Sequence, residues 1–248
     1  MTLLKPKVLR FDSLPSTNTE LARMASEGAA EGLVILADEQ TAGRGRLQRA
    51  WSSPKGAGLY FSILLRPAIP VDQWPLITFA AALAAGDALQ EAAGVQTDIK
   101  WPNDLLSGER KICGILAEAI DTPGGRAVIV GIGINLMPNA FPAATSVSEA
   151  TGLRPDREAI LAALLSGLTR WYALLGERDK VVAAWSSRSS YASGKLVQVS
   201  NGDETWQGTT CGVEPDGALR LQTASGEIKI VRAGDVSSVR ATDEHRCV

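Results

Sequence analysis

The sequence predicts an α/β protein with a larger N-terminal part and a small C-terminal β-barrel. Up to about Ser186, apolar runs with helical spacing alternate with short β-rich runs. Beyond that point, short alternating strands are separated by Asn-Gly, Asp-Gly and Ser-Gly turns, which is typical of a small barrel. A chain of 248 residues is long enough for one medium domain and one small one. We therefore expect two domains, at 1–186 and 187–248.

The first expected helix covers residues 16–28. Thr17 precedes Glu20 by three residues, which is the spacing of a capping box, and Gly28 ends the apolar pattern. The other elements of the larger part follow from apolar runs bounded by glycine or proline. We expect strands at 32–39, 58–67, 95–101, 111–120 and 126–136, and helices at 74–94 and 155–175. The segment 138–152 is expected to be irregular.

Histidine and cysteine are too scarce for the common catalytic and metal-binding arrangements. His245 is the only histidine, and Cys113, Cys211 and Cys247 form no CxxC pair and no zinc spacing. A Ser–His–Asp or Cys–His nucleophile would need a histidine from the end of the chain. If the chain is an enzyme, we expect its chemistry to depend on cations, amides and binding geometry.

Neither a secretory signal nor a membrane span is expected from the sequence. The first fifteen residues contain no long apolar stretch, so no secretory signal is expected. The longest apolar run, at 76–86, is far shorter than the roughly 20 residues that a membrane span needs. We therefore expect a cytoplasmic protein that does not associate with membranes.

Positive charge gathers in the stretch "AGRGRLQRAW" at 42–51, although the whole chain has a formal net charge of −2. Residues 40–71 contain no acidic side chain, and Gly43 and Gly45 allow a ligand to approach the backbone closely. The cations of this stretch are Arg44, Arg46, Arg49, Lys55 and Arg66. A compact anion such as a carboxylate or phosphate fits this pattern better than a nucleic acid does. The stretch is neither a P-loop nor a GxGxxG motif, and a solvated arginine-rich loop is the alternative.

Four further stretches combine polar residues with turns, strand ends or a helix start. They are "PSTNTE" at 15–20, "KWPNDLL" at 100–106, "RKICGILAE" at 110–118 and "GIGINL" at 131–136. Each has a purely structural interpretation: a helix cap, a proline turn, an exposed strand-end lysine, and a bulge or tight packing. Each also has a functional one, because a helix start holds polar head groups and a strand glycine such as Gly114 admits a ligand. Asn103 and Asp104 could hold phosphates, a ribose or Mg²⁺.

In their order and spacing, these stretches resemble the biotin–protein ligases over residues 8–240. The resemblance implies a catalytic domain with helices on a mixed sheet, followed by a Src-homology-3-like barrel. It implies ATP-dependent, AMP-forming attachment of biotin, through biotinyl-5′-AMP, to a lysine of the biotin carboxyl carrier protein of acetyl-CoA carboxylase. ATP and Mg²⁺ are the expected cofactors and biotin the substrate. No nucleic-acid or membrane partner is expected, and the state of self-association stays open, a homodimer included.

The resemblance also implies a role for each matching residue. The residues implied to bind biotin are Ser16, Thr17, Asn18, Gln40, Arg44, Gly45, Arg46, Lys111 and Gly114. Those implied to bind ATP are Arg46, Arg49, Trp51, Asn103, Asp104, Lys111 and Asn135, with Asp104 also next to the metal. Arg44 and Lys111 are the implied catalytic residues. The chain departs from the family at Gln48, where glycine is usual.

Two other functions stay open. A lipoate–protein ligase shares the architecture and the reaction type, although "GRGR" and "KWPND" favour biotin. A nucleic-acid-binding regulator could use the basic loop and the barrel, but the acidic total charge and the lack of a basic stripe argue against it. Only about fifteen residues precede "PSTN", so we expect the short form of the ligase, without an N-terminal helix-turn-helix domain.

Overall fold

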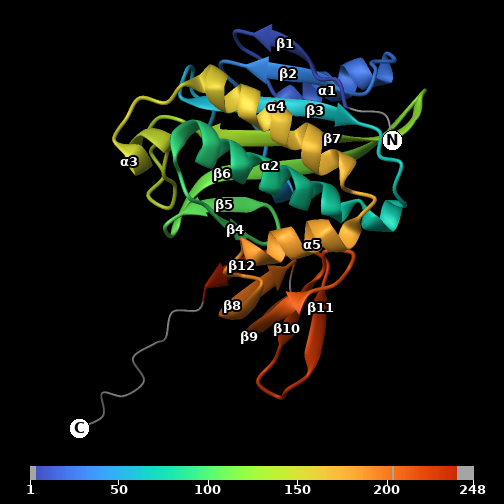
Figure 1. Cartoon of the computed structure of the whole chain (residues 1–248), viewed down its shortest axis with the longest axis vertical. Coiled ribbons are helices and arrows are strands. Elements are labelled where there is room, and N and C mark those ends of the chain that lie inside the picture. The colour runs from blue at the N-terminus through green and yellow to red at the C-terminus, as the bar shows by residue number, and fades with distance from the viewer. Residues whose placement is uncertain (1–3, 203, 239–248) are drawn as a thin grey trace.

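The computed structural model describes residues 4–202 and 204–238, which form two sheets and their helices. A seven-stranded sheet has the order β1-β2-β3-β7-β6-β5-β4, and a five-stranded sheet has the order β11-β10-β9-β8-β12 (Figure 1). The expected α/β class, with a mixed sheet and a small C-terminal β domain, is confirmed. His245 and Cys247 lie outside the described residues.

The seven-stranded sheet is mixed because β1 pairs parallel with β2, while every other neighbouring pair is antiparallel. Its strands are β1 (Lys7–Phe11), β2 (Leu33–Ala37), β3 (Gly58–Leu65), β4 (Asp98–Lys100), β5 (Asp104–Ser107), β6 (Arg110–Thr122) and β7 (Gly125–Asn135). Every residue of β3 is buried, in keeping with its continuous apolar sequence and its place inside the sheet.

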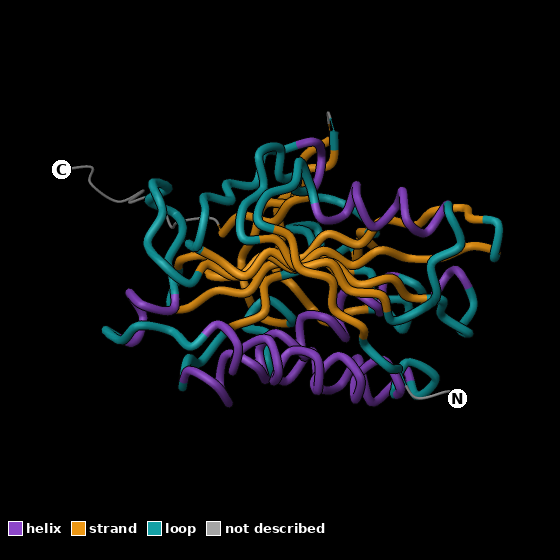
Figure 2. Tube along the Cα trace, turned by 90° about the horizontal axis from the view of Figure 1, so that it is seen from above, coloured by secondary structure: helices purple, strands orange, loops and turns teal. Residues whose placement is uncertain are grey.

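Helices cover both faces of this sheet. The helices are α1 (Thr17–Ser26), α2 (Pro75–Ala93), α3 (Val147–Thr151), α4 (Arg157–Ala173) and α5 (Arg178–Ser187), with short 3-10 turns at Arg46–Gln48 and Val71–Gln73. In Figures 1 and 2, α2 and α4 form a layer on one face, and α1 lies on the other. Gly167 of α4 lets the two helices pack closely, because an added Cβ would lie 3.1 Å from Ala84 Cα.

Two apolar clusters hold the layers together. The larger cluster lies between the sheet and α2 and α4, and it continues through Trp185 into the C-terminal sheet. There Phe79 and Trp185 stack with their ring centroids 4.2 Å apart. The smaller cluster lies beneath α1, where Leu21 and Ala25 contact Ile35, Leu64, Ala127 and Ile129.

The C-terminal sheet consists of five antiparallel strands. They are β8 (Ser193–Asn201), β9 (Glu204–Val213), β10 (Leu219–Gln222), β11 (Ile228–Val231) and β12 (Asp235–Ser238). The proposed domain boundary, between residues 186 and 187, falls at the end of α5. Within the described parts of the chain, the helices lack the combined length and apolar character that crossing a bilayer requires.

Three local expectations need correction. The N-cap of α1 is Ser16 rather than Thr17, since the Ser16 hydroxyl accepts from Thr19 N–H and Thr17 already lies in the first turn. Strand β4 is only three residues long, because the chain turns at Trp101–Pro102. The segment 138–152, expected to be irregular, contains the short helix α3, capped by Ser146 and ended by Gly152 in a left-handed conformation.

Candidate active site

A cavity of about 300 Å³ opens on the face of the main sheet that α1 covers. Ala127 and Ile129 of β7 pack beneath α1, and alternate residues of a strand share one face. Gly131 and Gly133 therefore continue the α1 face and form the floor of the cavity with Gly114 of β6, which pairs with Gly133. All the residues that the resemblance assigned to biotin or ATP line this one cavity.

The N-terminus of α1 carries a fixed network of neutral polar groups at one end of the cavity. Ser16, Thr17 and Asn18 are all buried. Gln40 Oε1 accepts from the Thr17 N–H at 2.8 Å and from its hydroxyl at 3.0 Å. The Ser62 hydroxyl lies 2.7 Å from Thr17 Oγ1 and 2.6 Å from Asn18 Oδ1. This end therefore suits an uncharged polar ligand group, because its donors and acceptors are preorganised and carry no net charge.

Glu118 of β6 connects this network to the arginine loop. Its Oε2 accepts from Asn18 Nδ2 at 2.7 Å and pairs with Arg44 Nη2 at 3.2 Å. The Nε of Arg44 is buried and has no partner among the described residues. A buried donor without an acceptor is unfavourable, so a ligand oxygen at this position would satisfy it.

The glycines of the floor make room for protein side chains. An added Cβ on Gly131 would lie 2.3 Å from Asn18 Oδ1, and one on Gly133 would lie 2.6 Å from the Trp51 indole. At Gly114 the near atoms, at 2.9 Å, belong to Lys111 and Trp51. Lys111 and Trp51 thus lie against Gly114, which also lines the cavity, so its expected contact with a ligand stays a prediction. Gly131 and Gly133 of "GIGIN" likewise line the cavity and give room to the side chains of Asn18 and Trp51.

Lys111 reaches across the floor from the start of β6. Its ammonium lies 2.6 Å from Asp104 Oδ1 and 5.1 Å from the centroid of the Trp51 ring. The indole Nε1 of Trp51 is buried and, within the described residues, has no acceptor. Lys111 is thus held between a carboxylate and an aromatic face at the cavity wall.

Asn103 and Asn135 line the cavity but bond mainly to the protein. Asn103 Nδ2 donates to the Ile115 carbonyl at 2.8 Å, and its Oδ1 accepts from Arg46 at 3.2 Å. Asn135 Nδ2 donates to the Thr145 carbonyl at 3.0 Å and to that of Lys111 at 3.3 Å. Both side chains hold adjoining loops in place, which the sequence patterns did not indicate.

Backbone hydrogen bonds join the two sides of the arginine loop. Gly45 N–H donates to the Arg49 carbonyl at 2.7 Å, and Trp51 N–H donates to that of Gly43 at 2.9 Å. Leu47 and Gln48 have φ values of 52° and 58°, a left-handed conformation that favours glycine. Glycine adopts this conformation without strain, which explains why the family that the sequence resembles usually has glycine where this chain has Gln48.

Two arginines of the loop meet the C-terminal sheet. Asp235 of β12 pairs with Arg46 at 3.6 Å and with Arg49 at closer range, and Arg46 also donates to the Gly234 carbonyl at 3.2 Å. Burial lowers the pKa of the Arg46 guanidinium, against the opposing effects of Asp235 and Asp104, but arginine stays charged in proteins. Asp235 was not predicted as a site residue because it belongs to an Ala-Gly-Asp turn, and Glu118 was not predicted either.

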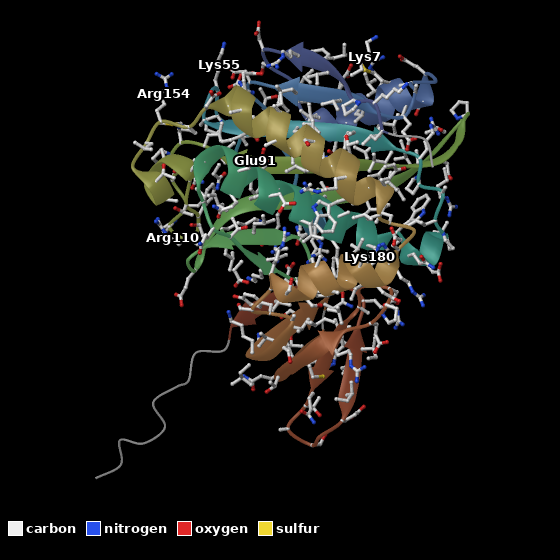
Figure 3. The ribbon with its side chains drawn as sticks, in the orientation of Figure 1. Lys7, Lys55, Glu91, Arg110, Arg154 and Lys180 are labelled. Carbon is white, nitrogen blue, oxygen red and sulfur yellow. The ribbon has the colours of Figure 1, made fainter. Side chains whose placement is uncertain are left out.

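The five cations of the acid-free stretch do not all converge. Arg44, Arg46 and Arg49 line the cavity. Arg66 instead donates to Thr122 and to carbonyls of the β6–β7 turn. Lys55 is exposed, and Figure 3 shows it at the periphery of the molecule. The expected anion site thus uses the loop arginines and Lys111.

Burial keeps two potential nucleophiles at the site, Tyr60 and Cys113, in their protonated forms. Burial raises the pKa of Tyr60 to about 12, and its hydroxyl donates to the Pro54 carbonyl at 2.9 Å. Burial likewise raises the pKa of the Cys113 thiol to about 12. Residues 4–202 and 204–238 contain no group of three acidic, histidine or cysteine side chains that could hold a metal. The chemistry that this cavity supports is charge stabilisation and positioning around an anion.

The comparisons with known proteins agree with this geometry. Residues 10–135 match the model of the biotin/lipoate A/B protein ligase family, and residues 192–238 match that of the biotin protein ligase C-terminal domain. The bifunctional ligase/repressor BirA of Bacillus subtilis is 39% identical over 242 residues, which cover 91% of this chain and 72% of that protein. The biotin–[acetyl-CoA-carboxylase] ligase of Paracoccus denitrificans is 37% identical, and the match covers 89% of this chain and 96% of that protein. A biotin protein ligase from Aquifex aeolicus, solved with biotin and ATP, has a TM-score of 0.79 at 30% identity, covering 94% and 99% of the two chains.

Proposed function

Because the chain belongs to the biotin protein ligase family, we propose that it biotinylates the biotin carboxyl carrier protein of acetyl-CoA carboxylase in the cytoplasm. The enzyme is an ATP-dependent biotin–protein ligase. A biotin carboxylate oxygen attacks the α-phosphorus of ATP, and pyrophosphate leaves with the electron pair of the broken P–O bond. The lysine amine then attacks the acyl carbon of biotinyl-5′-AMP, which yields an amide and AMP.

One observation carries this proposal: a single cavity joins a neutral polar end to a cationic end. The neutral end, around Thr17 and Gln40, matches an uncharged ureido ring. The cationic end, formed by the loop arginines and Lys111, matches a carboxylate and a phosphate that must approach each other. In the same cavity, the buried Arg44 Nε and Trp51 Nε1 lack acceptors among the described residues, which a bound ligand would supply.

In this proposal Arg44 and Lys111 neutralise the negative charge that builds up as two anions are joined. Lys111 is suited to that role because Asp104 and the Trp51 ring hold its ammonium in place. Arg46 and Arg49 bind phosphate, and Asp235 keeps both side chains at the cavity before ATP arrives. Asn103 and Asn135 act mainly by holding the nucleotide side of the cavity in shape.

Mg²⁺ would enter with ATP rather than bind to a site made by the protein alone. Asp104 is the one candidate ligand from the sequence, and its carboxylate already faces Lys111. One or two carboxylates together with substrate phosphates form an ordinary Mg²⁺ environment, so the residues fit a metal shared with ATP. The metal would neutralise phosphate charge, and it would compete with Lys111 for the Asp104 carboxylate.

Thermal unfolding with added ligands tests the choice of substrate. At about 100 times its dissociation constant, a ligand of the native state stabilises by about 2.7 kcal/mol. For a protein of this size, each kcal/mol shifts the melting temperature by roughly 2–4 °C, so biotin should raise it by about 5–11 °C. Lipoate or duplex DNA should have little effect. An equal shift with lipoate, or a shift with DNA and none with biotin, would contradict the proposed function.

A further inference from the structure

Arg44 is held by fewer groups than the other cations that the proposed reaction uses. Arg46 contacts two side chains and a carbonyl, and Lys111 lies between a carboxylate and an aromatic ring. Within residues 4–202 and 204–238, the Arg44 guanidinium has a single hydrogen-bond partner, the Glu118 carboxylate, at 3.2 Å. A glycine on either side of Arg44 leaves its backbone free to turn. The direction of the Arg44 side chain therefore depends on Glu118.

Glu118 is itself held in place by the main sheet and by α1. It pairs in β6 with Ile129 of β7, which packs beneath α1, and residues directly opposite each other on paired strands share one face. Its Oε2 accepts from Asn18 Nδ2 at 2.7 Å as well as from Arg44. Because both donors meet the same oxygen, turning the carboxylate away would break both bonds. Glu118 therefore gives the loop arginine a fixed acceptor.

A row of hydrogen bonds extends from Glu118 to the neutral end of the cavity. A carboxylate can only accept hydrogen bonds, so Asn18 must turn its amide nitrogen toward Glu118 and its amide oxygen toward Ser62. Ser62 is fully buried in β3, and its hydroxyl lies 2.6 Å from that oxygen. The row thus runs from Ser62 through Asn18 and Glu118 to Arg44. It anchors the Arg44 side chain to the buried sheet, whereas the loop that carries this arginine is mostly exposed.

The same contact leaves one donor of Arg44 for a ligand. Arg44 lines the cavity, and its buried Nε has no acceptor in the described part of the chain. A guanidinium is planar, so fixing Nη2 on Glu118 restricts the direction of the Nε–H bond as well. A ligand oxygen in that direction would remove the cost of the unpaired donor.

We propose that Glu118 is the positioning residue that directs Arg44 at the biotin carboxylate during adenylation. This inference rests on the proposed function, because it states how one cation of that reaction is held. Glu118 is not among the described residues that line the cavity, so it acts through Arg44 and touches neither substrate. The reaction benefits because an arginine of fixed direction does not have to reorganise while the two anions are joined.

Two substitutions at Glu118 test this role. Glu118→Met removes both hydrogen bonds and keeps a side chain of similar length, whereas Glu118→Gln keeps an oxygen that Asn18 and Arg44 can reach. Glu158→Gln is the matched control, because it changes another glutamate–arginine pair, with Arg10, that does not line the cavity. The Glu118 substitutions are also made in an Arg44→Ala background. Pyrophosphate release with biotin and MgATP gives kcat and the KM for ATP, and calorimetry shows that each variant is folded.

Glu118→Met should lower kcat at least about tenfold and leave the KM for ATP within about twofold, since the phosphate-binding arginines keep their own partners. The kcat of Glu118→Gln should lie between those of Glu118→Met and the unmodified enzyme, and Glu158→Gln should have no effect. In the Arg44→Ala background, the Glu118 substitutions should change kcat by no more than about twofold. An unchanged kcat in Glu118→Met would overturn the inference, as would an equal loss with and without Arg44. No pyrophosphate from the unmodified enzyme would contradict the proposed function, and this inference with it.

Discussion

One added methyl group at Gly133 should slow catalysis strongly while the protein still folds. Its backbone is not left-handed, so alanine is conformationally allowed there. The new Cβ would lie 2.6 Å from Trp51 Cε2 and Nε1, whereas non-bonded carbons settle at roughly 3.5–4.0 Å. The indole must therefore retreat by about 1 Å, which removes its contact with Lys111 and moves Nε1 away from the ligand space.

Overpacking of this kind costs about 1–3 kcal/mol, so Gly133→Ala should lower the melting temperature by roughly 2–12 °C. A displacement of about 1 Å in a group that positions the reactants can slow a reaction about 100-fold, and we expect that loss in pyrophosphate release. In a Trp51→Leu background the same glycine substitution should have little further effect, because the clashing indole is gone. Wild-type melting and wild-type adenylation by Gly133→Ala would refute the argument.

Three further predictions concern Lys111, Gln48 and Cys113. Lys111→Ala should slow adenylation at least ~100-fold while the protein stays folded, because one electrostatic stabiliser of the α-phosphate is lost; near-normal pyrophosphate release would rule the role out. Gln48→Gly should raise the melting temperature by roughly 2–4 °C, since a residue with a side chain costs about 1 kcal/mol in the left-handed conformation. A melting temperature below that of the unmodified protein, measured by calorimetry, would show that Gln48 is not strained. Cys113 should resist iodoacetamide at pH 8 in the folded protein, because the thiol is fully buried and its pKa is about 12, so peptide mass mapping should find it alkylated only after unfolding.

The elements of the fold were the most predictable part of the molecule. Helix α2 and helix α4 begin and end close to the expected residues, because their apolar residues, prolines and following glycine are local signals. The cap of α1 was misplaced by one residue, since Thr17 looks like a cap in sequence but bonds to Gln40 in the segment that follows β2. The pairing of β1 with β2 is a long-range parallel contact, which no local pattern reveals.

The sequence predicted which residues form the site, but it did not predict how their side chains are arranged. The family resemblance named residues that the fold gathers in one cavity, yet no pattern in the sequence showed which of them bond to the protein instead. Glu118 and Asp235 illustrate the limit, because each pairs with an arginine more than 70 positions away in the chain. The floor glycines Gly131 and Gly133 are explained only once Asn18 and Trp51 are seen beside them.

We expect the cavity to activate biotin as a non-covalent adenylate, without a nucleophile from the enzyme. The direct measurement is denaturing mass spectrometry of the protein after incubation with biotin and MgATP, together with quantitation of the released small molecules. We predict an unmodified protein mass, biotinyl-5′-AMP released on denaturation and one pyrophosphate for each adenylate formed. A stoichiometric biotinyl adduct on one defined residue of the protein would contradict the account.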